Sequence, residues 1–306
     1  MMNDKLVLYL QNVEKIKLYF GTDADKFSYS LALRYTVKGM VFHYVDYENI
    51  AQEIKKQTKW YSFAGVNFNI LTSYAAHFGK DYEKVAQALH YQKILTSYFT
   101  GGEHSYIAAM YGSTIEDAQR VNKLTQALAN TPNSQFFTLP LQSRALLATR
   151  AEEVAILAMS LQQYYEALIQ FGFARHSLTY ESAFILTVHS GPFDAQLIEQ
   201  LRAVLAILNQ AETTLKKRHY FVVVLLAIAQ CGAEDFIKLY ELHDALCLQT
   251  KLRPKYHPTL LIATQLYTLN KTPFEFSTSD FALTEVIHLF DSASNLDGGT
   301  DSGGGE

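Results

Sequence analysis

The stretch that decides the fold is residues 180–208, YESAFILTVHSGPFDAQLIEQLRAVLAIL. Its first half is apolar and ends at Gly191-Pro192, a pair that stops helices. After Asp194, apolar residues return every three or four positions, which is the spacing of one face of a helix. The stretch therefore predicts a buried helix, a turn and an amphipathic helix that begins near Asp194.

The same pair of segments recurs at residues 220–247, YFVVVLLAIAQCGAEDFIKLYELHDALC. Here Gly232 is the expected stop, and Glu234 and Asp235 form the acidic start of the second segment. The run 222–224 consists of three valines, which favour strands, but the equivalent segments elsewhere are rich in alanine and leucine. We therefore expect helix here too.

In two earlier copies, the first segment ends at Gly79 and at Gly112, respectively. Asp81 precedes the second helix of one copy, and Ser113 with Glu116 suits a capping box in the other. Glycine takes the left-handed conformation at a helix end with little strain, so we expect it at every one of these stops.

Equivalent points in successive copies lie 34 to 40 residues apart, a spacing typical of helix-pair repeats. The predicted fold is all-α, an irregular helix-hairpin repeat stack of the α-solenoid type. A compact multi-helix bundle follows the same pairing rules and remains the alternative. The points used are Tyr29, Val66, Tyr106, Pro140, Tyr180, Tyr220 and Pro258.

The expected domain limits follow from where apolar periodicity ends. Residues 279–290 have the pattern of a last helix, capped by Ser279 and Asp280. Glycine, serine and acidic residues dominate beyond them, and such a composition cannot bury a core. We expect one helical domain over 1–291 and a disordered tail over 292–306.

The composition excludes several classes of protein. Hydrophobic residues make up 49% of the chain and charged residues 18%, with a net charge of −4, and the only basic run is 216–218. A nucleic-acid partner would need a broader basic surface. The longest uncharged runs, 219–233 and 256–270, are too short to span a bilayer. With no signal-peptide pattern and only two cysteines, Cys231 and Cys247, we expect a cytoplasmic protein.

Four histidines are the candidate binding residues. Each lies just before or at the start of a first helix in its pair, so a regular stack would place them along one edge. Such an edge could bind an anion or a metal, although polar residues also occupy loops without binding anything. These residues are His104, His176, His219 and His257.

No catalytic or cofactor motif is present. The chain has no phosphate-binding, dinucleotide, nucleophile-elbow or zinc-protease sequence, so we expect no cofactor and no metal, and an enzyme is disfavoured. Glu285 and His288 share the spacing of a di-iron motif, but a single copy is insufficient. Tyr164, Tyr165 and Tyr240 lie on apolar stripes and are predicted to be in the core.

Several short segments together resemble the bacterial family of uncharacterised proteins called domain of unknown function 4003, found mostly in Gram-positive organisms. This resemblance spans about residues 60 to 270 and implies a cytoplasmic helical protein, with no assigned catalytic residues to carry over. The segments are Ser105-Tyr106-Ile107-Ala108-Ala109, Gln135-Phe136-Phe137-Thr138, Tyr164-Tyr165-Glu166-Ala167-Leu168, Gly172-Phe173 and Thr179-Tyr180.

The functional expectation rests on fold-level analogy. Helical repeats commonly hold a protein segment or peptide on the curved face of the stack, so we expect a binding or scaffold module. The alternative is an enzyme or ligand sensor with a metal or small-molecule pocket between helices. A cluster of histidine and carboxylate groups within ligand distance would favour that alternative.

Overall fold

The computed structural model describes residues 2–21, 27–58, 63–65, 67–132, 134, 137–210, 215–250 and 259–271. Within these ranges every regular element is helical, and 14 of them are α-helices. The all-α prediction is confirmed. The expected last helix, the expected tail and His257 lie outside the described residues.

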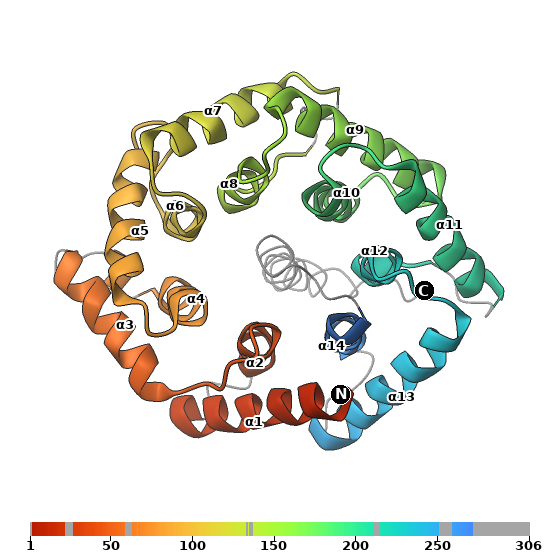
Figure 1. Cartoon of the computed structure of the whole chain (residues 1–306), viewed down its shortest axis with the longest axis horizontal. Helices are drawn as coiled ribbons and strands as arrows, with labels where there is room; N and C mark the ends of the chain where they lie inside the picture. The colour runs from red at the N-terminus through yellow and green to blue at the C-terminus, as the bar shows by residue number, and fades with distance from the viewer. Residues whose placement is uncertain are drawn as a thin grey trace, which may run out of the picture. The chain divides into compact units, whose positions relative to one another are not determined.

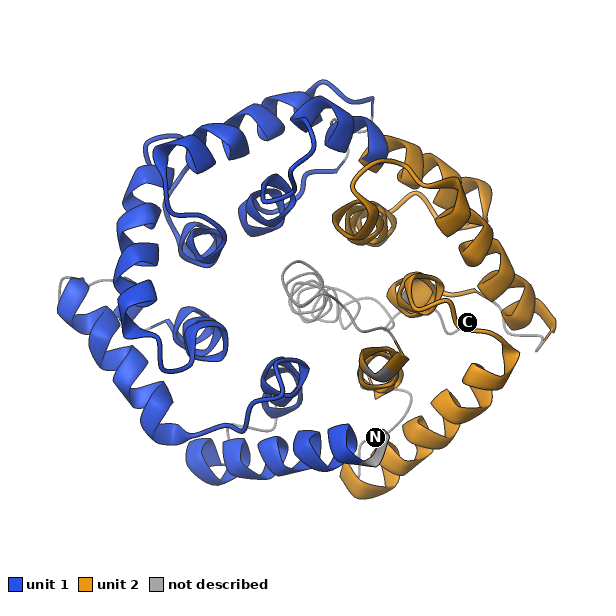
Figure 2. Ribbon diagram, in the orientation of Figure 1, with its two compact units in different colours: residues 1, 3–160 blue, residues 2, 161–306 orange. Residues whose placement is uncertain are grey.

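The chain divides into two compact units (Figure 2). Residues 1 and 3–160 make up unit 1, and residues 2 and 161–306 make up unit 2. The boundary falls inside α9, Val154–Gln170, so one continuous helix belongs to both units. The expected single domain over 1–291 stays a prediction.

Unit 1 is built from helix pairs. Its helices are α1 (Met2–Phe20), α2 (Ser28–Val37), α3 (Tyr44–Gln57), α4 (Phe68–Phe78), α5 (Tyr82–Leu95), α6 (Glu103–Ala108), α7 (Ile115–Ala129) and α8 (Leu141–Ala148), with short 3-10 turns η2 (Phe63–Gly65) and η3 (Ala109–Tyr111).

Two rows of helices run through unit 1 (Figure 1). The first helices of the pairs, α2, α4, α6 and α8, contact one another in chain order. Among the second helices, α3 contacts α5 and α5 contacts α7, while α3–α4, α5–α6 and α7–α8 contacts join the rows. Neighbouring pairs therefore pack with the same pattern.

Unit 2 continues with α10 (Ser177–Ser190), α11 (Ala195–Gln210), η4 (Lys217–His219), α12 (Tyr220–Ile228), α13 (Ala233–Thr250) and α14 (Thr259–Lys271). Its first helices α10, α12 and α14 contact one another in order, and α11 packs on α12 as α13 packs on α14. The three valines at 222–224 lie in α12, so the expectation of helix there is confirmed.

First and second helices differ in how much they bury. All nine residues of α12 are buried, and Arg144 is the only residue of α8 that is not. The second helices bury one stripe each, such as Ala118, Val121, Leu124 and Leu128 on α7. This contrast explains the sequence pattern, since a helix covered on all sides needs apolar residues all round and a surface helix needs them on one face.

The helix ends match the predictions at some positions and differ at others. Gly79 and Gly191 have φ values of 57° and 73°, the left-handed conformation that was expected. The expectation was wrong for Gly112, which is extended with φ −164°, and for Gly232, because Gln230 takes the left-handed conformation at the end of α12 with φ 51°.

The caps at the starts of the second helices also match the predictions at some positions and differ at others. Asp81 caps α5 through the main-chain N–H of Lys84, at 3.4 Å, as the sequence suggested. The box expected from Ser113 is wrong by one residue, because Thr114 caps α7 and Asp117 closes the box. Ser113 instead donates its main-chain N–H to Asp117, which already serves the cap.

The prediction that three tyrosines lie in the core is correct for two of them and wrong for the third. Tyr164 and Tyr165 are 0% and 2% exposed and belong to the core, as predicted. Tyr240 is 45% exposed, so its assignment to the core was wrong. It shares the apolar periodicity of α13 but lies at the margin of the buried stripe formed by Phe236, Leu239 and Leu242.

Candidate functional site

The histidines of the expected edge lie at helix starts. His104 is exposed in the first turn of α6 in unit 1. In unit 2, the Nδ1 atom of His176 accepts the main-chain N–H of Leu178 at 3.1 Å, and Nδ1 of His219 accepts that of Lys216 at 3.3 Å. Two of the four rings are thus engaged in local caps, and their joint role as a binding edge stays a prediction.

Among the described residues, no group of three or more His, Cys, Asp or Glu side chains is arranged to hold a metal ion. Nδ1 of His243 lies 3.2 Å from Asp244, and its Nε2 lies 3.7 Å from the sulfur of Cys247. His243, Asp244 and Cys247 all lie within about one turn of α13, and Asp244 is exposed.

A groove lies on the surface of unit 1 between α7 and the start of α9, and we call it the α7–α9 groove. Its volume is about 440 Å³. It is lined by Glu116, Gln119, Arg120, Lys123, Glu153, Val154 and Ala155.

The periodicity of α7 creates one wall of this groove. Glu116, Gln119, Arg120 and Lys123 are spaced three, four and seven residues from the first of them, so they share one face of the helix. The opposite face holds the buried stripe that begins at Ala118. A polar stripe therefore looks into the groove while the apolar stripe anchors the helix.

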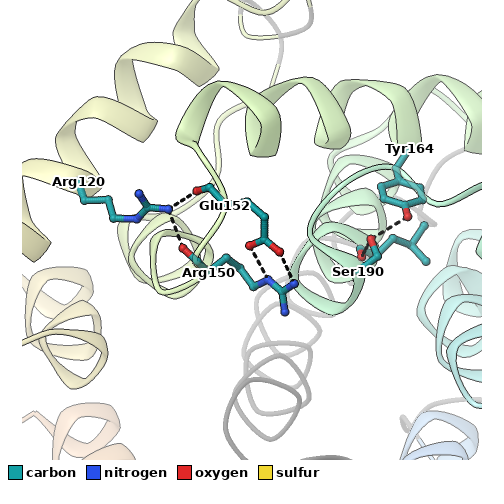
Figure 3. Close-up of polar contacts among 6 residues, drawn as sticks. Arg120, Arg150, Glu152, Tyr164 and Ser190 are labelled. Atoms are coloured by element: carbon teal, nitrogen blue, oxygen red, sulfur yellow. Dashed lines mark hydrogen bonds and ion pairs between the residues drawn. The ribbon is translucent and has the colours of Figure 1, made fainter.

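Arg120, which lines the groove, binds main-chain carbonyl groups (Figure 3). Its Nε donates to the carbonyl oxygen of Ala148 at 2.7 Å, and Nη2 donates to the carbonyls of Arg150, at 2.6 Å, and of Glu152. The first carbonyl belongs to the last residue of α8, and the other two belong to the connection between α8 and α9. One guanidinium thus fixes the start of α9 against the middle of α7.

A second arginine stabilises the same connection. Arg150 makes two hydrogen bonds to the carboxylate of Glu152, at 2.7 and 3.2 Å (Figure 3). Burial opposes the charge of Glu152, but the bonds from Arg150 outweigh it and hold the pKa of this carboxyl below its usual value. This bidentate pair joins two residues of the α8–α9 connection.

Three charged side chains of the groove have no ion pair within the part of the chain that the structure describes: Glu116, Lys123 and Glu153. All three are exposed. Arg120 also keeps its Nη1 atom without a partner among the described residues, since its bonds are made by Nε and Nη2. The groove thus offers charges and donors that an external molecule could bind.

A second recess, in unit 2, is lined mostly by apolar side chains. Its volume is about 20 Å³, which is room for a water molecule at most. It is lined by Leu208, His219, Val222, Phe236, Leu239, Tyr240 and Leu260. A recess of this size offers no volume for a ligand.

Unit 2 uses its buried polar groups to join elements. The hydroxyl of Tyr164 lies 2.8 Å from that of Ser190 and accepts the main-chain N–H of Asp194 at 2.9 Å, which ties α9 to the α10–α11 turn (Figure 3). Asp235 accepts bonds from the N–H of Gly232, at 2.7 Å, and from the side chains of Tyr267 and Lys271. Burial raises the pKa of Asp235, yet these three donors bring it below its ordinary value.

The groove was missed by sequence reasoning, although one signal for it was available. The stripe from Glu116 to Lys123 carries charge at a helical spacing on a helix whose other face is apolar. The stripe alone does not show that a groove lies beside it, because that depends on where α9 starts. The carbonyl contacts of Arg120 hold the segment before α9 against α7.

These residues define an all-α protein of packed helix pairs with a charged surface groove in unit 1. The chain belongs to the family described as "Protein of unknown function (DUF4003)", whose model matches residues 11–290. The resemblance noted from its short segments is thereby confirmed. No curated protein and no solved structure matches the chain. Among the described residues, no helix is long and apolar enough to cross a membrane.

Proposed function

We propose that this protein is a helical-repeat binding module, or scaffold, that engages a protein or peptide partner. The recurring contacts between successive helix pairs support an irregular, α-solenoid-like stack over a compact bundle. The observation that carries the proposal is the α7–α9 groove, whose three exposed charges have no ion pair among the described residues.

Burial decides which face of the stack a partner can reach. Nearly all side chains of the first helices α8, α10 and α12 are buried, so they have little surface to offer. The second helices bury much less, and α7 and α11 bury only four residues each. We therefore place the partner on the second helices of unit 1, where the groove lies.

We also propose that the protein works in the bacterial cytoplasm. Cys231 and Cys247 are both free, which is usual in a reducing compartment. Burial raises the pKa of Cys231 to about 11, so its thiol stays protonated and unreactive at neutral pH.

Site-specific photo-cross-linking tests this function. A benzoylphenylalanine residue at Gln119, inside the groove, should form an adduct with a partner in a lysate of the producing organism. The same residue at Gln87, exposed on α5, should not. Glu153→Lys should abolish the Gln119 adduct by reversing one groove charge. Equal adducts at both positions, or none at Gln119, would contradict the proposal.

The alternative is a ligand sensor or enzyme, and one observation favours it. A volume of about 440 Å³ lies in the range of small-molecule sites. Such sites, however, are mostly apolar and enclosed, whereas this groove is open and lined by exposed charges. Native mass spectrometry separates the two, because a retained small molecule adds mass to each chain and a protein-docking groove does not.

A further inference from the structure

We propose that the α7–α9 groove is a self-association surface, in which α7 of a second copy of this chain lies antiparallel to α7 of the first. The inference rests on the proposed role of the groove as a protein-docking surface and names its occupant. Three independent features of the groove support it: the order of charges along α7, the free donor of Arg120 and the balance of charge in the lining.

The order of charges on α7 is self-complementary. Glu116 and Lys123 are seven residues apart on the groove face, a separation of about 10 Å along the helix axis. A two-fold axis that passes between Gln119 and Arg120 makes Glu116 face Lys123 of the second copy, and Lys123 face its Glu116. Glu116 and Lys123, which have no ion pair among the described residues of one copy, then form two symmetric ion pairs in the dimer.

The middle of the stripe fits the same symmetry. Across the two-fold axis, Gln119 faces Arg120 of the second copy. The Nη1 atom of Arg120 is the part of the guanidinium that the main-chain carbonyls leave unused. It can donate to the side-chain oxygen of Gln119 while the rest of the group keeps its bonds. The dimer therefore adds a hydrogen bond without breaking the α8–α9 connection.

The balance of charge favours a protein of mixed charge over a polyanion. Two carboxylates, Glu116 and Glu153, and two cations, Arg120 and Lys123, line the groove. A nucleic acid or an anionic membrane would meet as much repulsion as attraction there. A second copy brings the same balanced set in reverse order.

Exposed apolar side chains at the start of α7 and of α9 supply contact area beside the charges. Ile115 is 53% exposed, Ile156 42% and Met159 61%. The surface is nevertheless small compared with the interfaces of permanent dimers, so we expect a reversible monomer–dimer equilibrium with a dissociation constant of about 1–100 μM.

Sedimentation velocity of the full chain tests the inference over a concentration series that spans this range. Glu116→Lys or Lys123→Glu alone places like charges opposite each other at two symmetric positions. Each should raise the dissociation constant of the dimer by about ten- to thirtyfold. The double variant E116K/K123E restores both pairs with their signs exchanged, so its dissociation constant should return to within about threefold of the parent value.

Lys93→Glu is the matched control, because Lys93 is an exposed lysine near the end of α5, the neighbouring second helix. It should leave the dissociation constant unchanged, and circular dichroism of all variants should keep the helical signal of the parent. A chain that stays monomeric at every concentration, a single reversal without effect, or a double variant that fails to dimerise would overturn the inference.

The outcome also separates this inference from the proposed function. A monomeric chain whose Gln119 cross-linker captures a different protein would reject the second copy as occupant and keep the docking function. A dimer that responds to the charge swap supports both. A monomeric chain without any adduct at Gln119 rejects both.

Discussion

Glu181 is a carboxylate in a position that opposes its charge. It lies on α10, where its Oε2 atom is buried and has no hydrogen-bond partner in the described part of the chain. Burial raises the pKa of this carboxyl from 4.5 to about 7. At neutral pH the side chain is therefore close to half protonated, and its protonated form suits the fold better.

The raised pKa predicts how stability depends on pH. The contribution of Glu181 is fully present below about pH 4.5 and is lost as the pH rises through 7, because the folded chain must then hold a buried charge. Glu181→Gln mimics the protonated acid. We expect it to raise the free energy of unfolding by about 2–3 kcal/mol at pH 8.5 and to change it little at pH 4.5.

Urea unfolding at the two pH values measures this difference. Glu241→Gln is the control, because Glu241 is exposed on α13 and its neutralisation should change stability equally little at both pH values. If the free energies of unfolding of the parent and of Glu181→Gln differed by the same amount at both pH values, the carboxyl would be well solvated in solution, which would contradict the prediction.

Buried carboxylates mark a limit of sequence reasoning at this scale. Asp235 was correctly placed at the acidic start of α13, yet its bonds to Tyr267 and Lys271 come from residues 32 and 36 positions later. Glu181 is a single acid in an apolar run, and its burial depends on how α10 packs. Periodicity assigns a residue to a face, but the partners on that face come from other elements.

At the scale of the element, helix junctions show why similar glycines have different roles. Gly112 follows η3 and is extended, so its backbone does not require glycine. A Cβ atom there would lie 2.6 Å from the ring of Tyr91, which is 1% exposed on α5. The glycine thus allows the η3–α7 junction to approach a buried ring closely.

Gly112→Ala should accordingly destabilise the protein by about 1–3 kcal/mol, because the ring of Tyr91 has no room to move in the core. Thermal unfolding followed by circular dichroism measures the loss. Gly101→Ala is the control, since its Cβ would meet its nearest neighbour, Thr96, at an ordinary 3.5 Å. Equal melting temperatures for both variants would contradict a steric role for Gly112.

Helix content could be predicted better than helix ends. The first helices are apolar on all sides and the second helices have a single apolar stripe. This difference can be recognised in the sequence, because the number of buried faces determines where apolar residues are needed. The stop of α12 was assigned to Gly232, but Gln230 adopts the left-handed conformation two residues earlier, at a cost that the buried helix offsets. A glycine near a helix end is thus a good marker of the junction and a poor marker of its geometry.

At the scale of the whole molecule, the two units share a helix. Residues 154–160 of α9 belong to unit 1 and the remainder of this helix to unit 2. Unfolding either unit would fray a helix that the other needs, and helix formation is cooperative. We therefore expect differential scanning calorimetry to give a single unfolding transition, in agreement with the predicted single domain.

Leu161 and Leu168, both fully buried on α9, provide the check. Leu161→Ala should lower the one transition as a whole, by the several kcal/mol typical of such core truncations. Two resolved transitions, with only one of them shifted by the substitution, would mean that the units unfold independently.

The burial of the first helices also has an evolutionary consequence. In α12 every one of nine positions meets packed neighbours, so almost any substitution there is costly, whereas the open face of a second helix tolerates exchange. We therefore expect relatives of this protein to differ in sequence mainly on their second helices and to remain similar in sequence on their first helices. Ser105-Tyr106-Ile107-Ala108-Ala109, which helped to reveal the family, begins in the first helix α6. We therefore expect the residues shared by the family to lie mainly in the interior and its differences to lie mainly on exposed faces.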